Sequence, residues 1–256
     1  LEFRRVLFRS ATPIYTNIAM PFDLQPPAVP DDNPTGLYRT TFTVPRAWRG
    51  RRVVLEVGGA ESVLMVWIDG TPVGLAKDSR LASEFDVTDH VRPGGRHTLA
   101  AMVVRWSDAS YLEDQDQWWH GGIHRSVRLV STPLVHLADV EVTAGLTDDL
   151  TTGTLEATVH VGFPEGADRA GWRVAAVLET LAGRRVTRTP LTGDVPGHTF
   201  PYLYEGAFVR LTTEVPRVRA WSHEDPHRYR LVVSLLDPTG AVHEVTAQTV
   251  GFRRVE

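Results

Sequence analysis

Residues Ser62–Val73 read SVLMVWIDGTPV, and this stretch decides the fold class. Val63 to Ile68 are apolar, with β-branched and aromatic members, which is typical of a buried strand. Asp69-Gly70 follows directly, and this dipeptide favours a type I′ turn, in which both central residues take a positive φ. The stretch therefore predicts a β-hairpin, and we look for further strands on either side of it.

Similar short strands are predicted before and after the hairpin, separated by turn residues such as Pro93-Gly94-Gly95. A spacing of about 8 to 12 residues is typical of a sandwich or jelly roll. No long helical period interrupts the series. We therefore expect an all-β protein whose first domain is a jelly-roll β-sandwich over residues 14–132, with strands at Leu37–Val44, Arg52–Val57, Phe85–Val87, Thr98–Arg105 and Ser126–Val130.

Thr132-Pro133 is the predicted domain boundary, because a second set of about seven strands begins just beyond it. Seven strands favour an immunoglobulin-like β-sandwich over residues 133–256. The predicted strands are Val135–Thr143, Thr154–Val161, Trp172–Thr180, Arg184–Thr189, Ala207–Glu214, Tyr229–Leu236 and Val242–Val250. At the other end, residues 1–13 open with LEFRRVLFRS and are interpreted as a cloning scar or disordered leader outside the fold.

Composition excludes several classes of function. The chain has 256 residues, a net charge of −4 and no Cys. The missing basic footprint argues against nucleic acid and anionic membrane as partners. Without Cys there is no disulfide, thiolate metal site or thiol nucleophile. No apolar run reaches the ~18 residues that a membrane span needs, and we expect a cytoplasmic protein.

Polar chemistry is densest in Arg105–Arg125, which reads RWSDASYLEDQDQWWHGGIHR. Carboxylates accept hydrogen bonds from hydroxyls while aromatic faces cover the C–H face of a sugar, so this mixture suits a polyol ligand. The alternative is a plain loop with its charges in water and its Trp residues packed beneath. The residues concerned are Asp108, Glu113, Asp114, Asp116, Trp106, Tyr111, Trp118, Trp119, His120 and His124.

The carboxylates of this loop differ in what they indicate. Asp114 and Asp116 would share a face of an extended segment, and a glycosidase needs two carboxyls at a set separation, but any D-x-D in a loop gives this spacing. Asp108 lies just beyond the predicted strand Thr98–Arg105, where a side chain can be held firmly and still face a cleft. An oxygen-only site for a hard cation remains open.

The two histidines give weaker evidence. His120 and His124 have i,i+4 spacing, which brings two His to one metal ion only on a helix. Gly121-Gly122 lies between them and argues against a helix. A zinc site is therefore not predicted.

Ordered motifs add information that spacing alone does not carry. They resemble the β-galactosidases of glycoside hydrolase family 2, from about Ile14 to the last residue. Ala109 departs from the Gly that is common in that family, and GIHR at the end of the loop is shared with its glucuronidase-like and mannosidase-like relatives. The motifs are YTN at Tyr15–Asn17, NPTGLY at Asn33–Tyr38, KDSRLASEFD at Lys77–Asp86, the loop Arg105–Arg125, WSHEDP at Trp221–Pro226 and VGFR at Val250–Arg253.

The resemblance implies a jelly-roll domain first, an immunoglobulin-like domain second and a (β/α)₈ barrel third. The family's catalytic glutamates belong to that barrel, which needs roughly 200 residues or more. We therefore expect this chain to be the N-terminal part of a retaining β-galactosidase, which hydrolyses terminal β-D-galactosyl residues such as that of lactose. It would hold no catalytic residue and would be inactive alone.

By the same resemblance, Asn17 and Asp108 would bind hydroxyls of the galactosyl unit. Asp108 would also ligate a sodium ion shared with the missing barrel, and magnesium is expected only in that barrel. The full-length enzyme would be a homo-oligomer, with the long connection Arg188–Ala207 either crossing an interface or lying as a surface loop.

Two other functions stay open at this stage. The chain could be a stand-alone carbohydrate-binding module with no hydrolytic activity, or a scaffold with no ligand. Under the favoured interpretation Glu113, Asp114 and Asp116 hold the loop and its neighbouring domain in place rather than touch the sugar.

Overall fold

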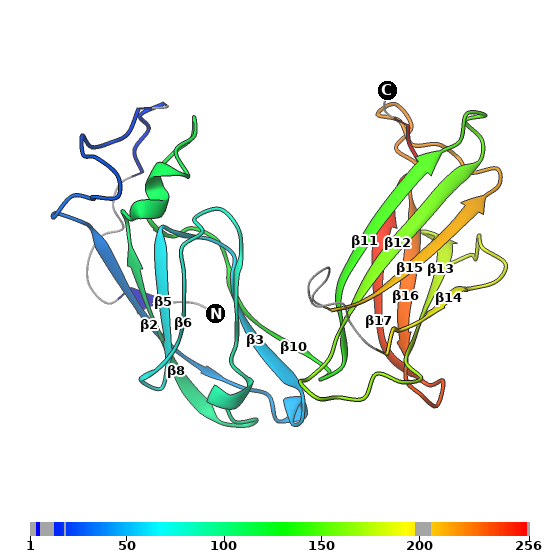
Figure 1. Ribbon diagram of the computed structural model, residues 1–256, viewed down its shortest axis with the longest axis horizontal. Helices are drawn as coiled ribbons and strands as arrows, with labels where there is room; N and C mark the ends of the chain where they lie inside the picture. Colours follow the sequence, from blue (N-terminus) through cyan, green and yellow to red (C-terminus); the bar gives the residue numbers. More distant parts are fainter. Residues whose placement is uncertain (1–3, 6–12, 18, 198–205, 255–256) are drawn as a thin grey trace. The chain divides into compact units, whose positions relative to one another are not determined.

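The computed structural model describes residues 4–5, 13–17, 19–197 and 206–254. The chain divides into two compact units, Leu1–Thr132 and Pro133–Glu256, at the Thr132-Pro133 step (Figure 1). The described part of each unit consists of strands, turns and, in the first unit, short 3-10 helices. The all-β prediction is therefore confirmed. Within the same residues, no helix has the length and apolar character needed to cross a membrane.

The described residues of the first unit form three antiparallel sheets. Its largest sheet has five strands in the order β1 (Arg4–Arg5), β2 (Thr35–Thr43), β8 (Arg96–Val104), β5 (Val63–Ile68) and β6 (Thr71–Ala76). A second sheet has the order β10 (Val127–Thr132), β3 (Arg52–Val57) and β7 (Ser83–Asp86), and the third pairs β4 (Ala60–Glu61) with β9 (Gly122–Ile123). The 3-10 helices are η1 (Arg46–Trp48), η2 (Thr88–His90) and η3 (Asp108–Tyr111).

The hairpin that decided the fold class joins β5 to β6. Asp69 has a φ of 50° and Gly70 a φ of 85°, as a type I′ turn requires. Leu64, Val66 and Ile68 of β5 enter the core of the first unit. Alternate residues of β8, namely Leu99, Ala101 and Val103, enter it as well. This period-2 burial is what a sheet with one buried face requires.

The N-terminal segment differs from the expectation in one respect. Arg4 and Arg5 form a two-residue strand that pairs with Arg39 and Tyr38 of β2. The outer edge of β2 has unpaired backbone groups there, and a short strand satisfies them. The rest of the segment called a leader lies outside the described residues, except for Pro13.

The second unit is a sandwich of two antiparallel sheets. One sheet has the order β11 (His136–Leu146), β12 (Gly153–Gly162) and β15 (Ala207–Val215). The other has the order β14 (Leu191–Asp194), β13 (Arg173–Thr180), β16 (Tyr229–Leu236) and β17 (Val242–Val250). Alternate residues of β12 and β16 are buried between the sheets, and Phe252, which is 0% exposed, completes this core.

One predicted strand of the second unit is wrong. Arg184–Thr189 forms no strand, and the edge strand is β14 instead. The backbone amides of Val186 and Thr187 both approach the Leu178 carbonyl, at 2.8 and 3.4 Å, so the pairing does not advance by one residue per step. Pro190 follows and donates no hydrogen bond, and regular pairing with β13 begins only at Leu191.

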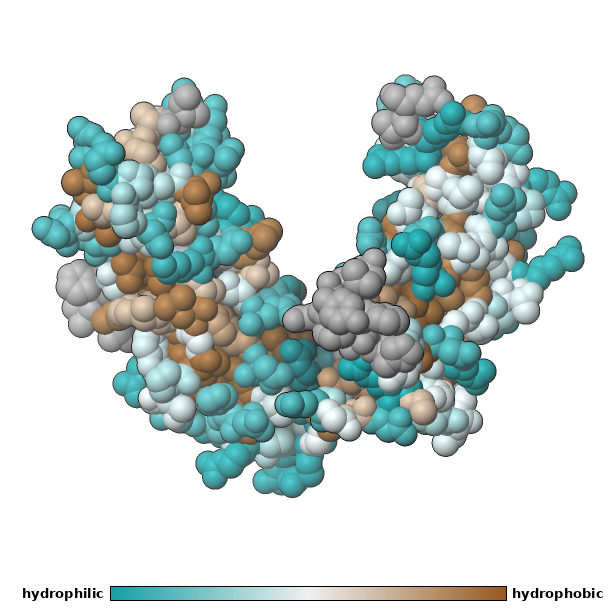
Figure 2. All heavy atoms as spheres, in the orientation of Figure 1, coloured by the Kyte–Doolittle hydropathy of each residue, from teal (hydrophilic) through white to brown (hydrophobic). Residues whose placement is uncertain are grey.

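The surface mixes polar and apolar residues. Figure 2 shows hydrophobic residues in brown among hydrophilic residues in teal on the visible face of both units. Scattered apolar side chains are normal on a folded surface.

Candidate functional site

Two loops of the first unit meet at one end of its five-stranded sheet. The N-terminal loop (residues 13–34) leads into β2, and the acidic loop (residues 105–125) follows β8. β2 and β8 pair along their length, with Thr35 opposite Val104, so the end of the N-terminal loop lies beside the start of the acidic loop (Figure 1, blue and green). The sheet register therefore brings together segments that are about a hundred residues apart.

Backbone and side-chain hydrogen bonds join the two loops. Ile14 and Trp119 exchange two backbone hydrogen bonds, of 3.1 and 2.9 Å. The Asn33 side chain donates to the Trp106 carbonyl at 2.8 Å and accepts from the Trp106 backbone amide at 2.9 Å. The Tyr111 hydroxyl donates to the Ala28 carbonyl at 2.6 Å. The N-terminal loop is thus fastened along its length, although its prolines prevent a regular ladder.

Aromatic packing adds to these bonds. The Trp106 and Trp119 rings are 5.3 Å apart in an edge-to-face arrangement, and Phe22 lies 5.3 Å from Trp106. Trp119 is 2% exposed and Trp106 is 7% exposed. These two tryptophans lie beneath the loops, as expected if Arg105–Arg125 were a plain loop with its Trp residues packed beneath it. Tyr15 and Trp118, in contrast, are half exposed, and their rings are 5.5 Å apart.

Asn17 lies in a turn of the N-terminal loop with an exposed side chain. Its φ of 56° falls in the left-handed region, which Asn tolerates better than most residues. The neighbouring Thr16 accepts a hydrogen bond of 3.2 Å from the Trp119 indole. The buried Trp119 therefore fixes the backbone next to Asn17 and leaves the amide of Asn17 at the surface.

Asp108 is the first residue of η3 and is also exposed. Its neighbours hold the backbone: Ser107 is 7% exposed and Ser110 0% exposed. The Ser62 hydroxyl donates to the Ser107 hydroxyl at 2.9 Å, and the Ser107 amide donates to the Ser110 hydroxyl at 3.1 Å. The structure thus holds the backbone around Asp108 and leaves the carboxylate exposed.

Lys77 is the charged partner of Asp108. Its ammonium group lies 2.7 Å from Asp108 Oδ1, and both side chains are about half exposed. The hydrogen bond from Lys77 is the main cause that holds the pKa of Asp108 below its ordinary value, although a weaker desolvation effect opposes it. Lys77 is the one lysine of the sequence, and its motif KDSRLASEFD gives no indication that it pairs with Asp108.

This pairing gives a test on the chain as it stands. We expect Lys77→Met to raise the pKa of the Asp108 carboxyl toward the ordinary value of about 3.9, because the hydrogen bond to the charged form is lost. An NMR titration of the carboxyl carbons measures it. Arg128→Met, which breaks the surface pair of Arg128 with Glu56, should leave the Asp108 pKa unchanged. An equal pKa in the Lys77 variant would contradict the pairing.

Two of the other acids are used inside the loops. Glu113 accepts from the Ser79 backbone amide at 2.8 Å and from the Ser79 hydroxyl at 2.5 Å. Asp116 accepts a hydrogen bond from the Tyr15 hydroxyl. These contacts fit the interpretation that Glu113 and Asp116 hold the loop. Asp114 differs, since its Oδ1 is buried and has no hydrogen-bond partner among the described residues.

The histidines make no helical metal site. Gly121 and Gly122 have φ values of 67° and 78°, so the segment between His120 and His124 is not a helix. The two imidazole rings stack 5.3 Å apart. Across the described residues, no group of three or more His, Cys, Asp or Glu side chains could hold a metal ion.

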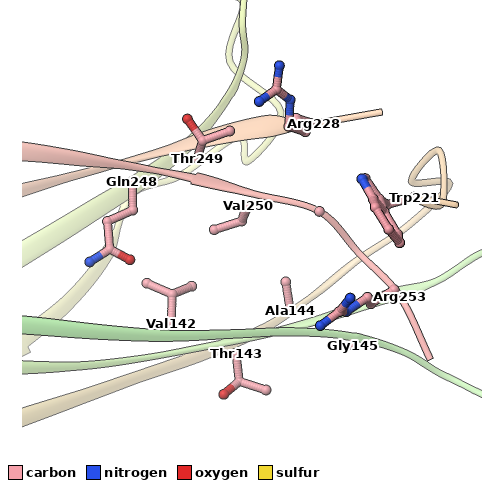
Figure 3. Close-up of a pocket in the computed structure, with 11 residues that line it drawn as sticks. Val142, Thr143, Ala144, Gly145, Trp221, Arg228, Gln248, Thr249, Val250 and Arg253 are labelled. Atoms are coloured by element: carbon pink, nitrogen blue, oxygen red, sulfur yellow. The ribbon is translucent and has the colours of Figure 1, made fainter. Parts of the chain in front are cut away.

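A separate cleft of about 550 Å³ lies in the second unit between β11 and β17. Figure 3 shows Val142, Ala144 and Val250 at its middle and Trp221 with Arg253 at one end. The Arg253 guanidinium lies 5.5 Å from the centre of the Trp221 ring. None of the residues predicted to bind sugar lines this cleft. Of the connection Arg188–Ala207, residues 198–205 lie outside the described residues.

Sequence reasoning missed two residues that organise the acidic loop. Glu61 is 1% exposed, and Arg80 binds both its carboxylate and the Trp118 carbonyl, each at 3.3 Å. The available signal was the position of Glu61 directly before an apolar strand, which suggests burial. A buried charge needs specific partners, so a structural role could have been expected.

Comparisons with known proteins follow the two units. A family model described as "Glycosyl hydrolases family 2, sugar binding domain" matches residues 6–133. A second, described as "Glycosyl hydrolases family 2", matches residues 135–253. The two matches meet at the boundary between the units.

Curated relatives match nearly all of this chain. A β-galactosidase of Pectobacterium atrosepticum is 41% identical over 251 residues, which is 96% of this chain and 23% of the relative. A β-galactosidase of Aeromonas hydrophila is 42% identical over 250 residues, which is 95% of this chain and 23% of the relative. The chain thus spans about a quarter of the length of these relatives.

Solved structures share the fold at low identity. A putative β-galactosidase from Bacteroides fragilis has a TM-score of 0.71 at 19% identity, over 86% of this chain and 33% of that one. A Bacteroides uniformis β-glucuronidase 2 has a TM-score of 0.72 at 20% identity, over 86% of this chain and 26% of that one. At this level of identity the likeness concerns the fold alone.

Proposed function

Because this chain belongs to glycosyl hydrolase family 2, we propose that it supplies the sugar-binding and immunoglobulin-like domains of a retaining β-galactosidase. The catalytic glutamates then come from a (β/α)₈ barrel in the same polypeptide. Such a barrel needs roughly 200 further residues. The name shared by the relatives that match over 95–96% of this chain supports β-galactosides, such as lactose, as the substrates.

The observation that carries this proposal is the exposed Asp108 carboxylate on a rigid frame. Ser107 and Ser110 fix its backbone while Lys77 fixes its side chain. A charged acceptor held in place in advance binds a sugar hydroxyl without a further ordering cost. Asn17 is the second proposed sugar contact. Its neighbour Thr16 accepts a hydrogen bond from the Trp119 indole. Hydroxyl contacts that strengthen as the ring distorts lower the barrier as well as the ground state.

Sodium is the proposed cation of this site. The Asp108 carboxylate fits as one hard oxygen ligand, and Oδ1 already accepts from the Lys77 ammonium and the Ala109 amide. Among the described residues, no group of three or more His, Cys, Asp or Glu side chains could form a complete metal site. The remaining sodium ligands, and any magnesium ion, belong in this proposal to the missing barrel. A homo-oligomeric full-length enzyme is likewise proposed.

The direct test compares the chain with the full-length polypeptide that contains it. We expect sustained hydrolysis of a chromogenic β-galactoside by the full-length protein and none above blank by residues 1–256. Activity of residues 1–256 alone would overturn the division of labour. A full-length protein that hydrolyses a β-glucuronide but no β-galactoside would overturn the substrate.

A second candidate function rests on the exposed pair Tyr15 and Trp118. Their rings are 5.5 Å apart and half exposed, and Asp116 accepts from the Tyr15 hydroxyl. Such a pair suits the C–H face of a sugar in a stand-alone carbohydrate-binding module. Calorimetry of residues 1–256 with galactose and lactose separates the two functions, since a module binds alone and half a site does not. Binding that Trp118→Ala abolishes would favour the module.

A further inference from the structure

Glu61 is a buried charge that the proposed chemistry does not use. Its side chain is 1% exposed. It ends β4, where it pairs with Gly122 of β9, the short strand at the end of the acidic loop. A carboxylate without water must be compensated by hydrogen bonds and opposite charge, or the fold would not keep it. Its partners therefore indicate what it does.

The carboxylate binds the backbone of the acidic loop. Oε2 accepts from the backbone amides of His120 at 2.6 Å and Gly121 at 3.1 Å. Gly121 has a φ of 67°, which turns these consecutive N–H groups toward one acceptor. The other oxygen, Oε1, is buried without a hydrogen-bond partner in the described part of the chain. One oxygen of Glu61 thus fixes two consecutive backbone amides of the acidic loop.

Two arginines connect this carboxylate to the rest of the loop. Arg80 lies 3.3 Å from Glu61 Oε2 and donates to the Trp118 carbonyl at 3.3 Å. Arg105, at the start of the loop, is 6% exposed; burial lowers its pKa and the charge of Glu61 opposes that shift. The negative charge of Glu61 therefore stabilises the guanidinium groups of both Arg80 and Arg105.

Arg80 is also connected to Asp108, the proposed sugar contact. Arg80 belongs to the short segment 77–82, whose first residue is the Lys77 that holds Asp108 at 2.7 Å. The next part of that segment, Ser79, is bound by Glu113 of the acidic loop. Displacement of Arg80 would therefore shift Lys77 and disturb the ion pair that orients Asp108.

We propose that Glu61 is a positioning residue for the sugar-binding loop. It fixes His120 and Gly121 by direct hydrogen bonds. By way of Arg80 it fixes Trp118 and the segment that carries Lys77, and through Lys77 it orients Asp108. The first part concerns this chain alone. The effect on sugar turnover rests on the proposed function.

Glu61→Gln tests the first part on residues 1–256. The amide keeps the size of the carboxylate but loses its charge, so the domain should fold while the loop loosens. We expect amide hydrogen exchange at His120 and Gly121 to speed up at least tenfold, with exchange in β8 changed less than twofold. Glu56→Gln, which removes another arginine-paired carboxylate of the same unit, is the control and should change neither. Unchanged exchange at His120 and Gly121 overturns the inference.

A double-mutant cycle tests the second part in the full-length protein. Glu61→Gln should lower kcat/KM for a β-galactoside about tenfold or more in the presence of an intact Asp108. In an Asp108→Ala background it should lower it less than twofold, because the residue it positions is gone. Equal losses in the two backgrounds would mean a merely structural role and overturn the positioning of Asp108. Absence of hydrolysis by the parent protein would overturn the proposed function, while the exchange measurement still decides the role of Glu61.

Discussion

Replacing Asp108 by Ala in the full-length protein should lower kcat/KM for a β-galactoside by roughly 10²–10⁴-fold. A hydrogen bond to a charged acceptor contributes about ten- to a hundredfold in a sheltered site, and two sugar hydroxyls can share this carboxylate. The loss should appear in kcat as well as KM, because these bonds strengthen in the distorted transition state. Steady-state kinetics on a chromogenic galactoside measure both parameters.

Two companion variants make this result specific. Asp89→Ala removes another exposed acid from the first turn of a 3-10 helix in the same unit and should leave the kinetics unchanged. Asp108→Asn keeps an acceptor but removes the charge, so it should fall between the wild type and Asp108→Ala. Activation by sodium should weaken in both Asp108 variants. Near-normal kinetics of Asp108→Ala, with sodium activation intact, would refute its assigned role.

Replacing Trp119 by Ala should destabilise the first unit by about 3–5 kcal/mol, the usual range for removing a buried tryptophan. Trp119 is 2% exposed, packs 5.3 Å from the Trp106 ring and donates its indole N–H to Thr16. The substitution would leave a cavity and an unpaired Thr16 at once. Denaturant unfolding of residues 1–256 measures the loss, with probes for each unit because two units need not unfold together.

Trp118→Ala is the matched control for this prediction. The same residue type one position earlier is 53% exposed, so its removal should change stability by about 0.5 kcal/mol or less. The comparison separates the buried anchor from its exposed neighbour without changing the kind of substitution. Equal losses from the two variants would contradict the assignment of Trp119 as the anchor between the N-terminal and acidic loops.

Most of the fold was predictable because its signals are local. The period-2 burial of β8 and β16 and the Asp69-Gly70 turn are visible in a few adjacent residues. The strand predicted at Arg184–Thr189 failed for an equally local reason that the sequence pattern does not show. There two successive amides compete for the Leu178 carbonyl, so the ladder starts later, at Leu191.

The candidate site was predictable only in part. Asn17 and Asp108 came from the motifs that carry the family resemblance, and the structure places both at the surface on the two loops that β2 and β8 bring together. The partner of Asp108 was not predictable, because Lys77 is 31 residues away. A carboxylate in a loop gives no indication of which distant cation it meets.

The sequence by itself therefore determined two all-β units, their main strands and the hairpin at Asp69-Gly70, since these follow from alternation and turn chemistry within short windows. Only the tertiary structure decided how the acidic loop is held. Glu61 binds the amide of His120 across 59 residues, and Tyr15 binds Asp116 across 101. Such pairs depend on sheet order and register, because these determine which loops, far apart in the sequence, lie next to each other.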